Sequence, residues 1–290
     1  MSLIGREDAG FTGICRAGAL AAAVMVVGTV GTASAGTQTI YTSVQVPYEI
    51  NVVSLGYQAT STREFGDHVR FAETYRDLST VTVQMSNWAK YSDWSGSYGA
   101  GGYSVPITPN LYNVLNPLSS PSVSSLIATQ TINPTIVWRP EDTAGCPAEK
   151  FMGSDSACYS GLAQFIQFDF TGTTVPEDVI FGLTFNTQSY GAVPTTVEGP
   201  YNSLNFGLSD TPPTVGTDVN PNVAFWNTSH AGFLTPGGPG VVNVFGPDTN
   251  WSPYTPAITF EAVPEPATLL LLATAAFGLG VTRRTRRALG

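Results

Sequence analysis

Basic residues, histidine and cysteine are all scarce in this chain, and each shortage excludes a class of function. The 290 residues contain 12 Lys and Arg against 21 Asp and Glu, which gives a formal net charge of −9. Such a charge repels phosphate backbones, so no nucleic-acid partner is expected. Only two histidines exist, His68 and His230, and no Gly-x-Ser-x-Gly sequence occurs. A hydrolase with a Ser-His-Asp triad is therefore not expected, and no other catalytic constellation stands out.

The three cysteines predict a disulfide rather than a metal site. Cys15 belongs to the N-terminal leader described below, which leaves Cys146 and Cys158 as a pair. In an oxidising compartment these two are expected to bond, and closing a loop of about 13 residues stabilises by about 3 kcal/mol on the chain-entropy model. No third Cys or nearby His completes a zinc site, and no Asp-x-Asp-x-Asp-Gly loop is present. No metal site and no cofactor are predicted, although one structural calcium stays open.

The N-terminus has the pattern of a secretory signal. Arg6 and Arg16 precede an apolar run over 17–30, and Ala33-Ser34-Ala35 fits the small-residue rule for cleavage, with Ala33 and Ala35 at the recognised positions. We therefore predict a signal helix within a signal peptide over 1–35, cleaved after Ala35. An uncleaved helix is the alternative.

The C-terminus carries a short apolar segment followed by a basic cluster. Residues 267–281 contain no charge and, as a helix, would span about 22 Å, which is short for a permanent anchor. A cluster of four arginines follows, at Arg283, Arg284, Arg286 and Arg287. Basic residues beside an apolar helix stay on the cytoplasmic side, so the preceding body is predicted to lie outside the cytoplasm.

The order Pro264-Glu265-Pro266, apolar helix and arginine cluster, with a signal peptide at the opposite end, resembles the PEP-CTERM exported proteins of bacteria. The resemblance covers the sorting signal, 263–290. It implies export through the Sec translocon, a transient inner-membrane anchor formed by the C-terminal helix, and processing by an exosortase that recognises the Pro-Glu-Pro motif. It further implies a final location at the cell surface or outside the cell, in organisms that make exopolysaccharide.

The region 36–262 between these signals is predicted to be one all-β domain. Residues 78–85, LSTVTVQM, place Val81, Val83 and Met85 on one face, as expected for a half-buried strand, and 165–170 and 179–185 repeat the pattern. Weaker strand patterns occur at 39–46, 51–58, 68–71, 105–114, 125–132, 203–208, 223–226 and 257–261. No window shows a helical stripe over ten residues.

About ten strands without an internal repeat favour two packed antiparallel sheets, as in a β-sandwich or jelly roll. Proline-rich stretches at 212–221 and 236–256 are predicted to be long connections or a stalk. The stretches 54–72, 78–89 and 178–191 are similar to an uncharacterised family of secreted bacterial β-sandwich proteins. That resemblance implies a fold and no catalytic residues.

The most distinctive stretch of the body is 87–103, NWAKYSDWSGSYGAGGY, in which aromatic residues alternate with Gly and Ser. Aromatic faces on a loop can stack against sugars, so Trp88, Tyr91, Trp94 and Tyr98 are candidate glycan-binding residues. The alternative is that Trp88 and Trp94 fold inward and cap the sheets. The first hypothesis for the body is nevertheless a non-catalytic surface or matrix protein associated with exopolysaccharide, with a carbohydrate-binding module as the alternative.

A glycosidase is a third hypothesis, because it requires two carboxylates close together. Glu64, Asp67 and Glu73 form the densest acidic cluster, and Glu141-Asp142 is a second. Three arginines interleave with the first cluster, and surface charge pairing explains that cluster equally well.

Overall fold

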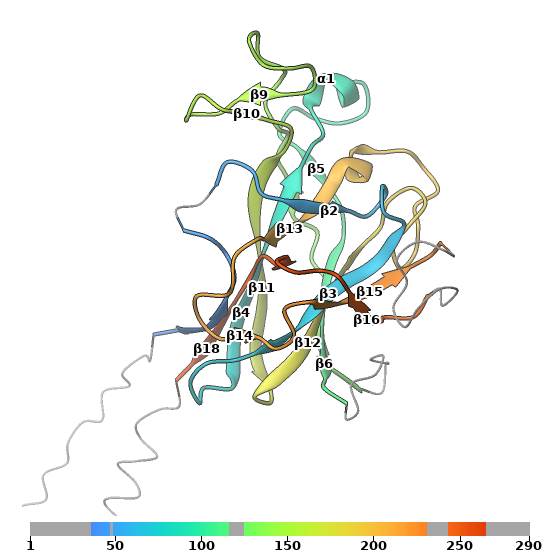
Figure 1. The fold of residues 1–290 in the computed structure, drawn as a ribbon. Coiled ribbons are helices and arrows are strands. Elements are labelled where there is room, and N and C mark those ends of the chain that lie inside the picture. Colours follow the sequence, from blue (N-terminus) through green and yellow to red (C-terminus); the bar gives the residue numbers. More distant parts are fainter. Residues whose placement is uncertain (1–35, 47–48, 116–124, 231–242, 265–290) are drawn as a thin grey trace, which may run out of the picture. The chain divides into compact units, whose positions relative to one another are not determined.

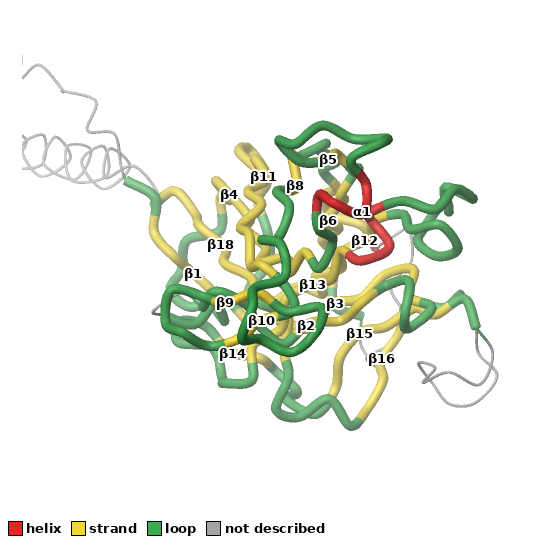
Figure 2. The backbone as a smooth tube through the Cα atoms, turned by 90° about the horizontal axis from the view of Figure 1, so that it is seen from above, coloured by secondary structure: helices red, strands yellow, loops and turns green. Residues whose placement is uncertain are grey.

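The computed structural model describes residues 36–46, 49–115, 125–230 and 243–264, and this part of the chain consists of strands and loops. Helix is confined to short segments, α1 (Tyr91–Trp94) and a 3-10 turn at Pro200–Ser203 (Figure 2). Every pairing between named strands is antiparallel. The predicted all-β, antiparallel class is confirmed.

Two seven-stranded sheets curl into a half-barrel (Figure 1). The first contains β1 (Gln38–Thr42), β2 (Ser54–Gly56), β4 (Asp77–Asn87), β11 (Leu162–Thr174), β13 (Leu204–Ser209), β17 (Thr255–Pro256) and β18 (Ile258–Val263). The second contains β3 (Thr62–Arg70), β6 (Ile107–Asn113), β7 (Leu126–Thr129), β12 (Asp178–Phe185), β14 (Thr217–Asp218), β15 (Val223–Thr228) and β16 (Gly246–Thr249). Two small ladders pair β5 (Tyr103–Ser104) with β8 (Thr135–Ile136), and β9 (Phe151–Met152) with β10 (Cys158–Tyr159).

The core lies between the sheets and follows the period-two pattern of the sequence. Val81, Val83 and Met85 of β4 are all fully buried. Aromatic rings join the two layers: Phe181 of the second sheet lies 6.3 Å from Phe206 and 5.9 Å from Phe260 of the first, between ring centroids. Apolar alternation along each strand therefore selects the faces that meet, as expected for a half-buried antiparallel sheet.

The central strand β4 defines two ends of the first sheet. At one end Asp77 pairs with Val263 of β18, and at the other Asn87 pairs with Leu162 of β11. The 11 residues of β4 rise about 3.3 Å each, so these ends lie about 33 Å apart. Gln38 of β1 pairs with Ala262, which places the start of the described chain at the same end as Val263.

The proline-rich stretches are not simple connections. The stretch 212–221 contributes β14, and 236–256 contributes β16 and β17, where its residues are described. All three strands are short, and β16 and β17 are the last members of their sheets, a position at which a strand tolerates proline. The prediction of a stalk over 243–256 is therefore wrong. In addition, β3 begins at Thr62, before the predicted 68–71.

The predicted signal helix and C-terminal helix lie outside the described residues. Within the described ranges, no helix has the length and apolar character needed to cross a bilayer.

Candidate functional site

The predicted glycan-binding aromatics do not form an open platform. Trp94 and Tyr98 are half-buried and pack against the core, and their ring centroids lie 6.1 Å apart at a near-perpendicular angle. Tyr103 is buried, with its hydroxyl donating to Asn87 Oδ1 at 2.9 Å. Tyr91 is half-buried and contacts Trp138 at 6.0 Å between centroids. Trp94 therefore packs inward, as the capping alternative expects of it.

Trp88 is the exception, since 44% of it is exposed. Its Nε1 donates to Ser86 Oγ at 3.0 Å, and Ser86 Oγ in turn donates to Asn51 Oδ1 at 2.6 Å. The ring packs over Gly161, where a Cβ atom would come within 2.4 Å of Trp88 Cδ1. A glycine opposite the tryptophan therefore leaves room for the ring, and part of the residue stays exposed.

A buried arginine ties the segments around Trp88 together. The side chain of Arg139 is 1% exposed. Its donors meet four acceptors: Trp88 O at 3.0 Å, Pro140 O at 2.9 Å, Asp142 Oδ1 at 2.9 Å and Glu149 Oε2 at 3.3 Å. Lys90 adds a second cation, 3.3 Å from Asp142 Oδ2 and 3.2 Å from Glu149 Oε2. We call segments 88–103 and 137–159 the distal cap.

The second predicted carboxylate pair, Glu141-Asp142, forms hydrogen bonds within the distal cap. The Arg139 hydrogen bond, with Lys90 nearby, lowers the pKa of Asp142. Glu141 accepts hydrogen bonds from Ser92 N at 2.9 Å and Ser92 Oγ at 2.7 Å, which lower the pKa of its carboxyl. Both carboxylates are thus held by local donors.

The predicted disulfide between Cys146 and Cys158 is present, with 5.6 Å between the Cα atoms, and is confirmed. It joins the loop after Arg139 to β10, so it closes the same cap that Arg139 holds.

The prediction that Glu64, Asp67 and Glu73 form one carboxylate cluster is wrong, because their side chains point in different directions. Glu64 and Asp67 are three positions apart, so in a strand of period two they lie on opposite faces of β3. Asp67 faces the core. Glu64 lies on the outer face, accepting from Asn110 Nδ2 at 2.8 Å and Tyr112 Oη at 2.9 Å, and its burial raises its pKa. Glu73 occupies an exposed turn with φ of 57°.

His68 has the structural role that its strand position predicts. It is 6% exposed, and its Nε2 lies 3.4 Å from Asp178 Oδ2. Burial lowers the pKa of His68 in spite of Asp178, which acts in the opposite direction.

Asp67 has a different carboxylate neighbour, which is distant in sequence. Asp218 of β14 pairs with Val69 of β3, and paired residues share a face, so Asp218 lies diagonally beside Asp67. Asp67 accepts from His68 N at 2.7 Å and Thr255 Oγ1 at 2.9 Å, while Asp218 Oδ1 accepts from Asn220 N at 3.1 Å. No described residue donates to Asp218 Oδ2, and no described cation forms an ion pair with either carboxylate.

The two carboxylates shift each other's protonation. Burial, followed by the charge of Asp218, raises the pKa of Asp67 well above its ordinary value. Burial raises the pKa of Asp218 to about 6. Near neutral pH the pair therefore holds one proton more than two exposed aspartates would.

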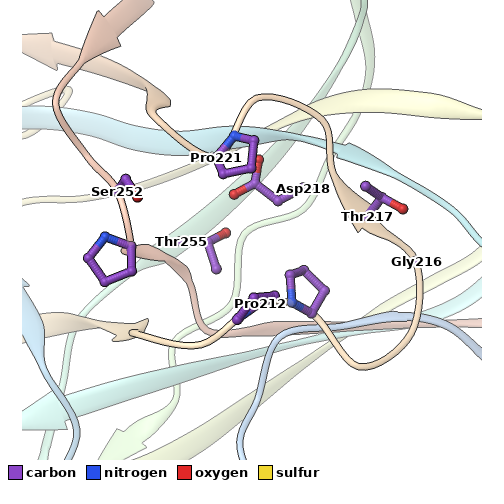
Figure 3. A pocket seen from close by; sticks show the side chains of 9 residues that line it. Pro212, Gly216, Thr217, Asp218, Pro221, Ser252 and Thr255 are labelled. Atoms are coloured by element: carbon purple, nitrogen blue, oxygen red, sulfur yellow. The ribbon is translucent and has the colours of Figure 1, made fainter.

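A pocket of about 270 Å³ opens onto Asp218, and Asp67 lies behind it, fully buried. Asp218 and Thr255 point toward its centre, and their side chains come from β14 and β17 (Figure 3). Four prolines form its walls: Pro212, Pro213, Pro221 and Pro253. We call this site the acid pocket. Sequence analysis missed it because its parts lie up to 188 residues apart, as in the Thr255–Asp67 hydrogen bond.

Tyr41 completes the polar layer behind the acid pocket. Its ring packs against Gly216, which lines the pocket and where a Cβ atom would come within 2.7 Å of Tyr41 Cδ2. The side chain is fully buried, and its hydroxyl lies near the hydroxyls of Ser43 and Thr255. Burial, with Asp67 as the next cause, raises the pKa of Tyr41.

The sorting signal follows the body directly. Val263 ends β18, and Pro264 is the last described residue before Glu265, Pro266 and the four arginines, which lie outside the described residues, as do Ala33 and Ala35. A family model described as the PEP-CTERM protein-sorting motif matches residues 262–287. No curated protein and no solved structure matches the chain.

This match defines the class of the chain as a strand-rich protein with a C-terminal sorting signal. The chain carries a PEP-CTERM sorting motif, and the predicted resemblance to PEP-CTERM proteins is confirmed. The motif implies export through a membrane-anchored intermediate and processing by an exosortase.

Proposed function

We propose that the body is a non-catalytic protein of the cell surface or extracellular matrix that associates with exopolysaccharide after exosortase processing. The observation that carries the proposal is the match to the sorting motif, at 262–287, which begins within the last strand. Uncharged polar residues, rather than ionic groups, make up much of the body: charged residues are 11% of the chain. Such a surface suits close contact with hydrated neutral polymers.

The position of the motif orients the body relative to the membrane. Val263 and Gln38 lie at one end of the first sheet, so the anchored intermediate holds this end toward the bilayer. The distal cap begins at the opposite end, about 33 Å away along β4. The cap, with Trp88, therefore faces outward before release.

The full chain, expressed in an exosortase-carrying bacterium that makes exopolysaccharide, tests this proposal. We expect a shortened form that sediments with the polysaccharide, and an uncut membrane-bound form when the exosortase gene is deleted or Glu265→Ala is introduced. Glu261→Ala, four positions earlier and within β18, is the control and should be processed normally. Processed protein that stays entirely in the medium when polysaccharide is present contradicts the matrix role.

Carbohydrate binding is the second candidate function, and the exposed face of Trp88 favours it. A tryptophan fixed in one orientation beside hydroxyl and amide groups can stack on a sugar ring and hydrogen-bond its substituents. Half-buried Asn51 supplies an amide near the ring, while the fully buried Ser86 hydroxyl links Asn51 to the indole nitrogen.

Retention of the processed protein on the producer's own polysaccharide separates the two candidates. Direct binding predicts that Trp88→Ala loses retention, whereas Tyr91→Ala, a half-buried aromatic of the same cap, keeps it. Circular dichroism of both variants checks that the fold is intact. Equal retention of wild type and Trp88→Ala argues against a glycan site at Trp88 and leaves the matrix role in place.

A further inference from the structure

A second aromatic side chain lies on the surface that carries Trp88. Tyr159 of β10 is half-buried, and its hydroxyl donates to Asp155 Oδ2 at 2.5 Å. Its ring packs over Gly153 together with Ile50, since a Cβ atom on that glycine would come within 2.7 Å of Tyr159 Cε2 and 2.6 Å of Ile50 Cδ1. The hydrogen bond and the glycine thus hold the Tyr159 ring beside Ile50.

The segment that contains Ile50 connects the two aromatic residues. Ile50 O accepts a hydrogen bond of 2.8 Å from the backbone of β11, and Asn51 Oδ1 accepts from the Ser86 hydroxyl, which also accepts from Trp88 Nε1. In Figure 1 this segment, in blue, runs below the β9–β10 hairpin as it approaches β2. The residues that follow one another across this surface, which we call the aromatic strip, are Trp88, Asn51, Ile50 and Tyr159.

Carboxylates outnumber cations around the aromatic strip. The distal cap contains three Lys and Arg residues against five Asp and Glu residues. Two of these cations, Lys90 and Arg139, are held by carboxylates of the cap within 3.3 Å. The hydrogen bond to Asp155 raises the pKa of Tyr159, and the charge of Glu49 is near enough to add to this shift. Glu49 and Asp155 are both exposed, and no ion pair joins either of them to a described cation.

These groups restrict the chemistry of a ligand. Aromatic rings stack on the apolar faces of sugars, and an amide beside them can hydrogen-bond the hydroxyl groups. Two rings on one surface suit consecutive sugars of a chain. A uronate or sulfate group on those sugars would bring an anion beside Glu49 and Asp155, and placing like charges together weakens binding.

We propose that the aromatic strip binds a polysaccharide whose sugars carry no carboxylate or sulfate, with consecutive sugars on Trp88 and Tyr159 and the Asn51 amide between them. This inference rests on the second candidate function, carbohydrate binding at Trp88. It adds Tyr159 as a second contact and makes the exposed carboxylates of Glu49 and Asp155 the basis of selection against acidic polysaccharides. Salt screens exposed charges, so this selection weakens as ionic strength rises.

Affinity electrophoresis of the full-length chain in detergent, at pH 8 in native gels that contain polysaccharide, tests the proposal. Hydroxyethylcellulose and carboxymethylcellulose are the probes, because they share one glucan backbone and differ in charge. We expect hydroxyethylcellulose to retard the wild-type chain, and carboxymethylcellulose to bind about tenfold more weakly at low salt.

Variants separate the rings from the charges. Trp88→Ala and Tyr159→Ala should each lose retardation, whereas Tyr159→Phe keeps the ring and should keep binding. Tyr254→Ala is the matched control, since Tyr254 is a 37% exposed aromatic residue on the loop before β17. Glu49→Gln should leave binding of hydroxyethylcellulose unchanged and narrow the difference between the two polymers.

The proposal is overturned if the wild-type chain is not retarded by hydroxyethylcellulose, or if carboxymethylcellulose retards it equally at low salt. Loss of binding in Trp88→Ala alone, with Tyr159→Ala unchanged, contradicts the strip and leaves a site at Trp88. If Tyr159→Ala fails to fold, Glu49→Gln still decides, because an unchanged difference between the polymers contradicts selection by charge. Sedimentation with the producer's own polysaccharide tests the matrix role separately from all of these outcomes.

Discussion

The distal cap and the acid pocket each bury a charged side chain almost completely. Arg139 in the cap is 1% exposed and meets two carbonyls and two carboxylates within 3.3 Å. Asp67 behind the pocket is fully buried and meets two neutral donors and a second acid, Asp218. The charge of Arg139 is fully matched by acceptors, whereas the neighbour of Asp67 is a second acid.

This difference separates a structural charge from a candidate site. A buried charge with complete partners holds its neighbours in place, and its removal leaves those partners unpaired. A buried acid beside another acid raises the pKa of both and leaves the site ready to accept a proton. The cap therefore should respond to mutation mainly in stability, and the pocket mainly in pH dependence.

The largest expected effect is on Arg139. Arg139→Met keeps the stem but leaves the carbonyl oxygens of Trp88 and Pro140 without a donor, so we expect a loss of about 3 kcal/mol in the free energy of unfolding. Urea denaturation measures it. Arg70→Met is the control, since Arg70 forms an exposed ion pair with Asp178 and should cost less than about 1 kcal/mol. Equal losses of stability for the two arginine variants would contradict the inference that buried Arg139 holds the distal cap in place.

A somewhat smaller loss is expected when the disulfide is removed. Cys146→Ser with Cys158→Ser frees a loop whose ends are 12 residues apart and should destabilise by about 2–3 kcal/mol. Hydrogen exchange should show faster opening over 140–159 and little change in β12 or β18, because Arg139 still anchors the cap. Faster exchange across both sheets would mean that the cap and the body unfold as one unit.

The smallest effect, and the one that sharpens the contrast most, concerns Asp218. Its pKa of about 6 in the folded protein lies above the value of about 3.9 in an unfolded chain. A raised pKa means that stability is greatest below about pH 4 and decreases as pH rises through about 6. Asp218→Asn should flatten this decrease and raise stability at pH 7 by on the order of 1 kcal/mol, since water in the pocket screens part of the charge.

Thermal unfolding between pH 4 and pH 8 follows this effect, with Asp248→Asn as a control on a carboxylate that accepts a hydrogen bond from Trp251 Nε1. A pH profile that is unchanged in Asp218→Asn would show that the acid pair does not titrate as described.

Most of the fold could be predicted from local patterns. The alternation in 78–85, 165–170 and 179–185 corresponds to β4, β11 and β12, although β12 is buried on both faces. The strands that escaped prediction have two to four residues each: β5, β8, β9, β10, β14, β16 and β17. Such strands form because a neighbouring strand offers free backbone groups, and nothing in their own residues indicates it.

The candidate sites divide in the same way. The disulfide was predictable because only two cysteines remained to pair, and the sorting motif because its three parts are contiguous. Glu64 and Asp67 look like one cluster along the chain, yet the pleat separates them. The partner of Asp67 is Asp218, some 150 residues later in the chain, and no spacing rule connects the two.

Composition and local order alone determined the C-terminal sorting motif, the all-β class, the cysteine pairing and the strand faces of this protein, because each depends on solvent preference or on residues close together in the chain. Only the tertiary structure decided that Trp88 stays outside while Trp94 packs inward, that Arg139 is satisfied, and that Asp67 and Asp218 are neighbours. These outcomes depend on register between distant strands, which is set by the packing of the whole core.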